Sequence, residues 1–221
     1  MKLELSEKEL EELANQLSCP SGGHGRDVAK LMNETNINMT LSTVNDMGLS
    51  DGQSILELGH GNAEHLSNVL KQAKNLTYCG LDISPLMKEE AERINSRFIS
   101  GKVASFHLYD GTNIPFGAAS FDRIFTVNTI YFWEQPLALL NELYRVLKPN
   151  GQCHITFAQK RFVEQLPFAK YKFELYDNNT VLKLIQQTSF RLIDIIDKTE
   201  LVKSKTGEFV DREYAIVSLK K

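Results

Sequence analysis

The chain has 221 residues, of which 42% are hydrophobic and 24% are charged, a composition typical of a soluble globular domain. Its formal net charge of −3 argues against a general binder of nucleic acid or of anionic membranes. No apolar run reaches the roughly 18 residues that a membrane span needs. The acidic, amphipathic N-terminus also lacks the apolar region of a secretory signal, so we expect a cytoplasmic protein.

Cysteine and histidine spacing gives no sign of a metal site. Cys19, Cys79 and Cys153 lie far apart and form no C-x-x-C pair, which argues against a disulfide framework and against a zinc site. The histidines show no ligand spacing such as H-E-x-x-H. We therefore expect no metal and a reducing compartment.

The first 50 residues predict a helical lid. Ser6 and Glu9 form a capping box in front of apolar positions at helical spacing, which predicts a helix over residues 7–17. The turn-rich segment CPSGGHG at 19–25 predicts a break in the chain. Two short helices around 26–34 and 37–47 are then expected.

From Ser54 onward the pattern alternates between strands and helices. This alternation predicts a doubly wound, mostly parallel sheet with helices on both faces, in a second unit spanning residues 51–221. The charge-rich segment 198–213 is most simply a solvated hairpin. The expected strands are 54–59, 76–83, 103–110, 123–130, 152–159, 190–197 and 213–219, and the expected helices are 63–74, 84–97, 136–147 and 177–189.

The segment LELGHGNAEHL at 56–66 places two glycines directly after the first expected strand and before a helical pattern. A turn without Cβ atoms can adopt positive φ and lets a ligand approach the backbone N–H groups. For Gly59 and Gly61 alone, a plain tight turn is an equally good interpretation. His60 between them either faces solvent or contacts a ligand.

Asp82, at the end of the second expected strand, favours a ribose-binding role for this edge of the sheet. Ligands of doubly wound sheets bind beyond the carboxyl ends of the strands, and a carboxylate there accepts from vicinal hydroxyls. The alternative is a helix cap in front of Ser84 and Pro85.

The residue in place of a third glycine indicates which nucleotide binds. A dinucleotide-binding G-x-G-x-x-G sequence would have its third glycine at position 64, where this chain has Glu64. Glu64 and Glu57 would repel a pyrophosphate, but they suit a ligand with a cationic centre and no phosphate. These residues favour S-adenosylmethionine and disfavour an NAD-dependent oxidoreductase.

Four segments in order resemble the class I S-adenosylmethionine-dependent methyltransferases. They are ILELGHGNA, GLDIS, YDGTNIPFGAASFDRIFTVNTIYFW and ELYRVLKPNGQCHITF, within roughly residues 50 to 160. The resemblance implies a Rossmann-like, seven-stranded, mostly parallel sheet with an antiparallel last strand, and S-adenosylmethionine as the cofactor. Ala63 departs from the family, in which many members have a third glycine.

The resemblance also assigns roles to the strand ends. Glu57, Gly59 and Gly61 would line the methionine part of the cofactor, and Asp82 would bind the ribose hydroxyls. Ile83, Asp110 and Gly111 would surround the adenine. Asn128 and Thr129 would lie near the methyl donor.

Methyl transfer from a sulfonium is an in-line displacement that needs mainly alignment and desolvation. The segment at 128–131 lacks the two prolines of the N-P-P-Y sequence found in methyltransferases of DNA bases, so we expect a small-molecule acceptor and no nucleic acid. Tyr131, with the two aromatic residues after it, forms either an acceptor wall or core packing. His24 is a candidate base or merely a mobile loop residue.

The favoured hypothesis is therefore a small-molecule methyltransferase that is a monomer or a homodimer. A protein that binds S-adenosylmethionine without transferring methyl groups, and acts as a regulator or partner, is the alternative.

Overall fold

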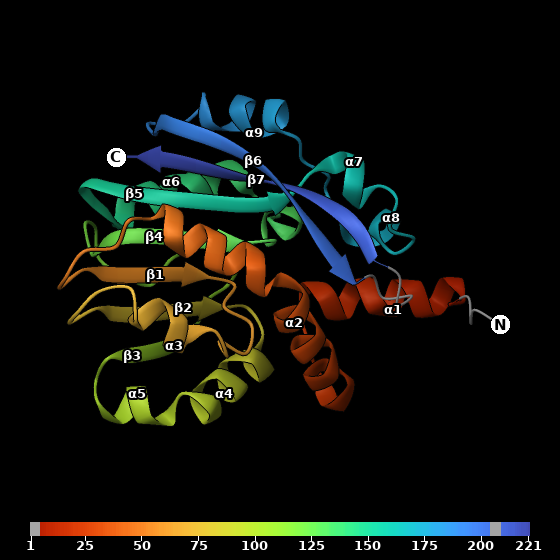
Figure 1. Ribbon diagram of the computed structural model, residues 1–221, viewed down its shortest axis with the longest axis horizontal. Coiled ribbons are helices and arrows are strands. Elements are labelled where there is room, and N and C mark those ends of the chain that lie inside the picture. Colours follow the sequence, from red (N-terminus) through yellow and green to blue (C-terminus); the bar gives the residue numbers. More distant parts are fainter. Residues whose placement is uncertain (1–4, 204–208) are drawn as a thin grey trace.

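The protein is described by a computed structural model that covers residues 5–203 and 209–221. These residues form a seven-stranded sheet with the order β3-β2-β1-β4-β5-β7-β6. Strand β7 is antiparallel to both of its neighbours, and the other pairs are parallel. Helices lie on both faces, with α2 in front of the sheet and α6 behind it (Figure 1). The predicted fold class is confirmed.

The first four strands follow the predicted segments to within three residues, whereas the last three extend further, and the fifth begins at Leu147, which was predicted to end a helix. The C-terminal hairpin runs from the pair Arg191 and Lys220 to the pair Lys203 and Phe209, so the segment 198–213 mostly continues the two strands. The strands are β1 (Ser54–Leu58), β2 (Thr77–Asp82), β3 (Ala104–Leu108), β4 (Phe121–Val127), β5 (Leu147–Ala158), β6 (Arg191–Lys203) and β7 (Phe209–Lys220).

The helix predicted over 63–74 is wrong in extent, because only α3 (Leu66–Leu70) forms there. Gly61 and Ala63 have φ of 55° and 49°, so the chain is still turning where the helix was expected to begin. Two short helices in the segment 160–172 were not predicted. The remaining helices are α4 (Pro85–Ile94), α5 (Ser96–Ser100), α6 (Pro136–Val146), α7 (Lys160–Val163), α8 (Ala169–Lys172) and α9 (Asn178–Ile185), with a 3-10 turn at Ile130–Phe132.

Residues 5–50 form two helices, α1 (Glu7–Ser18) and α2 (Gly22–Asp46). The predicted capping box is present, since Ser6 N donates to Glu9 Oε2 at 2.8 Å. The prediction of two short helices is wrong, because α2 is one helix of 25 residues. Its Thr35 hydroxyl contacts the carbonyls of Leu31 and Met32, a contact that bends helices, and α2 changes direction along its length (Figure 1).

The two halves of α2 have different surroundings. In the C-terminal half, Met39, Thr43 and Val44 are buried, and Thr43 Oγ1 lies 2.7 Å from Thr156 Oγ1 in β5. This half is therefore part of the layer that covers the sheet. The N-terminal half lies over the strand ends. The division into a lid (1–50) and a second unit (51–221) stays a prediction. Among the described helices, none has the length and apolar character needed to cross a membrane.

Side chains that alternate along the strands pack into two separate hydrophobic clusters. In β1, Leu56 and Leu58 belong to the cluster beneath α6 and α9, whereas Ile55 belongs to the cluster beneath α2, α3 and α4. Gly80 of β2 has no room for a side chain, because a Cβ there would lie 2.6 Å from His60 Cδ2 and 2.8 Å from Phe106 Cδ1. The sheet therefore accommodates the His60 ring only because residue 80 is glycine.

We expect the Gly80→Ala substitution to lower the free energy of unfolding by about 1–3 kcal/mol, because the added methyl group overpacks a buried site. Urea denaturation measures the change. Gly23→Ala is the matched control, since a Cβ at Gly23 meets no atom within 4 Å. The control should leave stability unchanged or raise it by up to about 1 kcal/mol. A Gly80→Ala protein as stable as wild type would contradict this account of the packing.

Candidate functional site

A pocket lies at the carboxyl ends of β1, β2 and β4, beneath the N-terminal helices. Its core side is formed by residues that end the strands, within the segments 57–62, 82–83 and 127–129. Its lid side, defined as the lining residues from the first 50 positions, consists of Leu17, Ser18, Pro20, Ala29, Met32, Asn33, Asn36 and Thr40. Parallel strands that end at one edge thus bring segments distant in sequence together.

The turn after β1 depends on its glycines. Gly59 and Gly61 have φ of 73° and 55°, a region that side chains disfavour. A Cβ at Gly59 would also lie 2.4 Å from Thr129 Cγ2. The backbone of β1 therefore passes directly against the end of β4, and Thr129 is held from behind by its contact with Trp133 Nε1 at 3.1 Å.

Asp82 ties the ends of β1 and β2 together. Its buried carboxylate accepts from Gly61 N at 3.0 Å through Oδ2 and from Ser84 N at 2.9 Å through Oδ1. Burial raises the pKa of this carboxyl, and His60 with the neighbouring N–H groups holds the rise back. The N-cap of α4 is Ser84, which accepts from Met87 N, and Asp82 contributes to this helix start only by accepting from Ser84 N.

Glu57 is a second buried carboxylate in the lining. Its Oε2 accepts from His65 Nε2 at 2.8 Å and from the Tyr78 hydroxyl, and within the described residues Oε1 has no partner. Burial alone lowers the pKa of His65, but the charge of Glu57 and their hydrogen bond outweigh it, so the pKa is raised above 6.5. The sequence did not identify His65 or Tyr78 as site residues, because no local pattern connects them to Glu57.

His60 does not face solvent, so that interpretation is wrong. Its ring is buried and packs edge-on against Phe106, at a centroid distance of 5.0 Å. Nδ1 contacts Gly61 O at 2.7 Å, whereas Nε2 has no partner among the described residues. Burial lowers the pKa of His60, and the nearby carboxylates of Asp82 and Glu57 oppose this shift.

The end of β4 presents Asn128 and two aromatic side chains to the pocket. Phe132 and Trp133 belong to the lining, whereas Tyr131 does not. The buried Tyr131 hydroxyl lies 3.0 Å from Asn128 Oδ1 and 3.0 Å from Ala158 O, on the core side of Asn128. Phe132 and Trp133 of the expected aromatic wall therefore line the pocket, whereas the Tyr131 hydroxyl contacts Asn128 from the core side.

Besides Tyr131, two further predicted site residues lie outside the pocket lining. His24 is exposed on the first turn of α2. Asp110 is exposed, and its carboxylate accepts from the N–H groups of Thr112 and Asn113 within its own loop. The functional roles of His24, Tyr131 and Asp110 stay predictions. The pocket lining includes the other predicted positions, namely Glu57, Gly59, Gly61, Asp82, Ile83, Gly111, Asn128 and Thr129.

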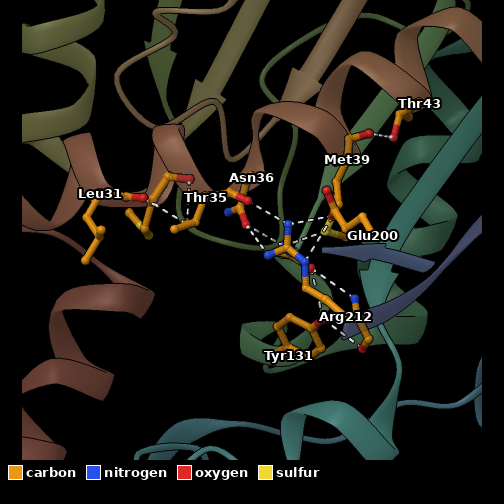
Figure 2. A network of polar contacts seen from close by, with 11 residues as sticks. Leu31, Thr35, Asn36, Met39, Thr43, Tyr131, Glu200 and Arg212 are labelled. Atoms are coloured by element: carbon orange, nitrogen blue, oxygen red, sulfur yellow. Dashed lines mark hydrogen bonds and ion pairs between the residues drawn. The ribbon is translucent and has the colours of Figure 1, made fainter. Parts of the chain in front are cut away.

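A buried ion pair links the C-terminal hairpin to the pocket. Arg212 Nη2 donates to Glu200 Oε1 at 2.7 Å and to Thr35 O at 2.6 Å, and Arg212 Nη1 donates to Asn36 Oδ1 at 3.2 Å (Figure 2). The expectation that the segment 198–213 is a solvated hairpin is therefore wrong for Glu200 and Arg212. The pairing of these two residues could have been inferred from the strand register, in which Glu200 stands opposite Arg212 across the hairpin.

The lining suits a nucleoside with a cationic centre. Glu57 and Asp82 are buried carboxylates with remaining acceptor capacity, and among the described residues that line the pocket none is a lysine or an arginine. A phosphate group would meet these carboxylates, and His65, whose pKa is raised, is already paired with Glu57. The glycine turn leaves its backbone open to a ligand, because nothing within 4 Å occupies the Cβ position of Gly61.

We expect the His65–Glu57 pair to make stability depend on pH. A histidine whose pKa is raised in the folded state stabilises the fold below its unfolded value, and the contribution is lost as pH rises through the folded pKa. In urea denaturation at several pH values, the free-energy difference between wild type and His65→Gln should be largest below about pH 6 and should shrink at higher pH. A difference that grows with pH would contradict the assigned charge of His65.

Comparison with known proteins gives the same assignment as the geometry. A family model described as "Methyltransferase domain" matches residues 56–155. The uncharacterized methyltransferase YdaC of Bacillus subtilis is 33% identical over 125 residues, which cover 54% of this chain and 65% of that protein. The chain thus spans slightly less than two thirds of this relative.

Solved structures share the fold at low sequence identity. A SAM-dependent methyltransferase from Aquifex aeolicus aligns with a TM-score of 0.62 at 20% identity, covering 94% of this chain and 98% of that one. Geranyl diphosphate C-methyltransferase from Streptomyces coelicolor aligns with a TM-score of 0.68 at 11% identity, covering 93% and 88%. The matched domain, the methyltransferase relatives and the solved structures of the same fold together support a class I S-adenosylmethionine-dependent methyltransferase.

Proposed function

We propose that the protein transfers a methyl group from S-adenosylmethionine to a small-molecule acceptor by in-line displacement. The observation that carries this proposal is the covered pocket at three neighbouring strand ends, which is lined by two buried carboxylates and a glycine turn. The bound cofactor would supply an activated methyl group on a sulfonium. The chain's own residues would bind it, orient it and exclude water.

Each part of the core side has a proposed partner in the cofactor. Asp82 would accept from the ribose hydroxyls, since both of its oxygens keep free lone pairs. Glu57 would face the ammonium group of the methionine part through Oε1. The adenine would lie between Ile83 and Gly111, which both line the pocket. Thr129 and Asn128 would border the methyl group.

The contacts of the N-terminal helices with the strand ends support a desolvated reaction site. Ser84 Oγ donates to Pro20 O at 2.6 Å, and Asn128 Nδ2 donates to Asn36 Oδ1 at 3.0 Å. Because a sulfonium is already a good leaving group, alignment without water is the main contribution that the protein must make.

The acceptor would enter from the lid side. The covered position of the pocket favours a small molecule over a macromolecular substrate, and the lack of lysine and arginine in the described lining argues against nucleic acid. The Streptomyces relative of the same fold is named for methylation of geranyl diphosphate, a small molecule. A cytoplasmic location and a monomeric or homodimeric state stay predictions.

Isothermal titration calorimetry tests the cofactor. We expect S-adenosylmethionine and S-adenosylhomocysteine to bind and NAD not to bind. Asp82→Ala should weaken cofactor binding at least about tenfold, because two ribose hydroxyls lose their acceptor. Asp27→Ala, at an exposed position of α2 outside the lining, is the control and should bind like wild type. Tight binding of NAD with no binding of either sulfur nucleoside would contradict the proposed methyltransferase function.

His24→Ala tests whether the lid histidine is a base. Because His24 lies outside the lining, we expect unchanged transfer of labelled methyl groups and unchanged cofactor affinity. Slower transfer at equal affinity would show that His24 reaches the acceptor in the complex. Cofactor binding without any transfer by the wild-type protein would instead favour the non-catalytic regulator.

A further inference from the structure

A chain of amide contacts fixes the orientation of Asn128 at the end of β4. Asn128 Oδ1 accepts from Ala158 N at 3.1 Å, and a backbone N–H can only donate. The other end of the amide, Nδ2, must then face away from Ala158. It donates to Asn36 Oδ1 on α2 at 3.0 Å. The backbone of β5 therefore determines which way the Asn128 amide points.

Arg212 fixes the orientation of the next amide, that of Asn36. A guanidinium has no acceptor atom, so the atom of Asn36 that lies 3.2 Å from Arg212 Nη1 must be the oxygen. Asn36 Oδ1 thus receives two donors, one from Arg212 and one from Asn128. Because Asn36 lines the pocket, its Nδ2 group is left to face the ligand space, and it has no partner among the described residues.

The arginine is itself held in place. Glu200 Oε1 accepts from Arg212 Nε at 3.1 Å and Nη2 at 2.7 Å, and Arg212 is only 6% exposed. Thr35 O accepts a further hydrogen bond from Nη2 at 2.6 Å. This planar fork contacts three acceptors at once, and a lysine ammonium does not reproduce that geometry. Figure 2 shows Arg212 between Asn36 and Glu200.

Apart from Arg212, whose guanidinium is paired with Glu200, the lid-side lining around the Asn36 amide is uncharged. Met32, Thr40, Phe132 and Trp133 line the same pocket, and the described lid-side lining contains no acidic, basic or histidine side chain. Burying an ionised group of an acceptor there would be costly, because the lid-side lining offers no charged side chain and Arg212 is already paired with Glu200. An oxygen atom on an apolar body, by contrast, would find one N–H donor and an apolar enclosure.

We propose that Asn36 Nδ2 donates a hydrogen bond to the methyl acceptor. The acceptor is an uncharged compound with a carbonyl or hydroxyl oxygen on an apolar body. Arg212 is the residue that positions the Asn36 amide. The inference rests on the proposed methyltransferase function. It adds a substrate class and two specificity-determining residues to it.

Asn36→Asp is the decisive variant, because it keeps an oxygen for Arg212 and Asn128 but replaces the pocket-facing donor with an acceptor. Asn38→Asp makes the same change of charge on the same helix, at an exposed position outside the lining. A small-metabolite extract is separated by ion exchange into neutral, anionic and cationic fractions. Each fraction is incubated with methyl-labelled S-adenosylmethionine and protein.

We expect the wild-type protein and Asn38→Asp to label the neutral fraction, and Asn36→Asp to label it at least about tenfold more slowly with unchanged affinity for S-adenosylhomocysteine. Equal labelling by Asn36→Asp and wild type, or labelling of the charged fractions alone, would overturn the inference and leave the methyltransferase function intact. Labelling of no fraction by wild type would overturn the proposed function and, with it, the inference.

The role of Arg212 needs a variant that still folds. Arg212→Met alone leaves Glu200 buried without its partner, whereas the double variant Arg212→Met/Glu200→Met removes the ion pair as a unit. We expect the double variant to need at least about fivefold more neutral fraction for half-maximal labelling, with the maximal rate and cofactor affinity nearly unchanged. A loss of maximal rate alone, or no change, would contradict a positioning role.

Discussion

The hydrogen bond from Gly61 N to Asp82 is the contact on which the rest of the site depends. It joins the turn after β1 to the end of β2, and it exists because Gly61 adopts a positive φ that presents its N–H to the carboxylate. Parallel pairing of β1 with both β2 and β4 sets the three strand ends side by side. The pocket is therefore a consequence of strand register, with a glycine turn as its floor.

Electrostatics then determine what this pocket can hold. Two carboxylates are buried at one edge of the sheet, and His65 is the group that compensates Glu57. The described lining offers no lysine or arginine to a phosphate. A class I methyltransferase fold supplies the general location of the cofactor, and these particular charges explain why a sulfonium amino acid suits this chain better than a dinucleotide.

The central sheet and the strand-end residues were predictable from sequence because they depend on local patterns. A glycine pair after an apolar run and an acidic residue at the next strand end are recognisable without a structure. The misplaced elements depend on distant contacts. The segment 26–47 looks like two helices, yet Thr35 and Asn36 sit at a junction where Arg212, 176 residues from Asn36, binds the helix.

The same reasoning explains which site residues were not predicted. The burial of His60 depends on the absence of a side chain at Gly80, one strand away. His65 and Tyr78 are relevant to the site because both contact Glu57. Tyr131 contacts Asn128, whereas the two aromatic residues after it line the pocket. Such roles come from three-dimensional packing between elements, which periodicity and spacing do not record.

The most direct test of the central claim is a crystal structure of the protein with S-adenosylhomocysteine. The account predicts that the ribose hydroxyls contact the Asp82 carboxylate and that the amino acid part lies along the turn of Gly59 and Gly61, next to Glu57. A ligand bound elsewhere, or bound in this pocket with its ribose away from Asp82, would contradict it.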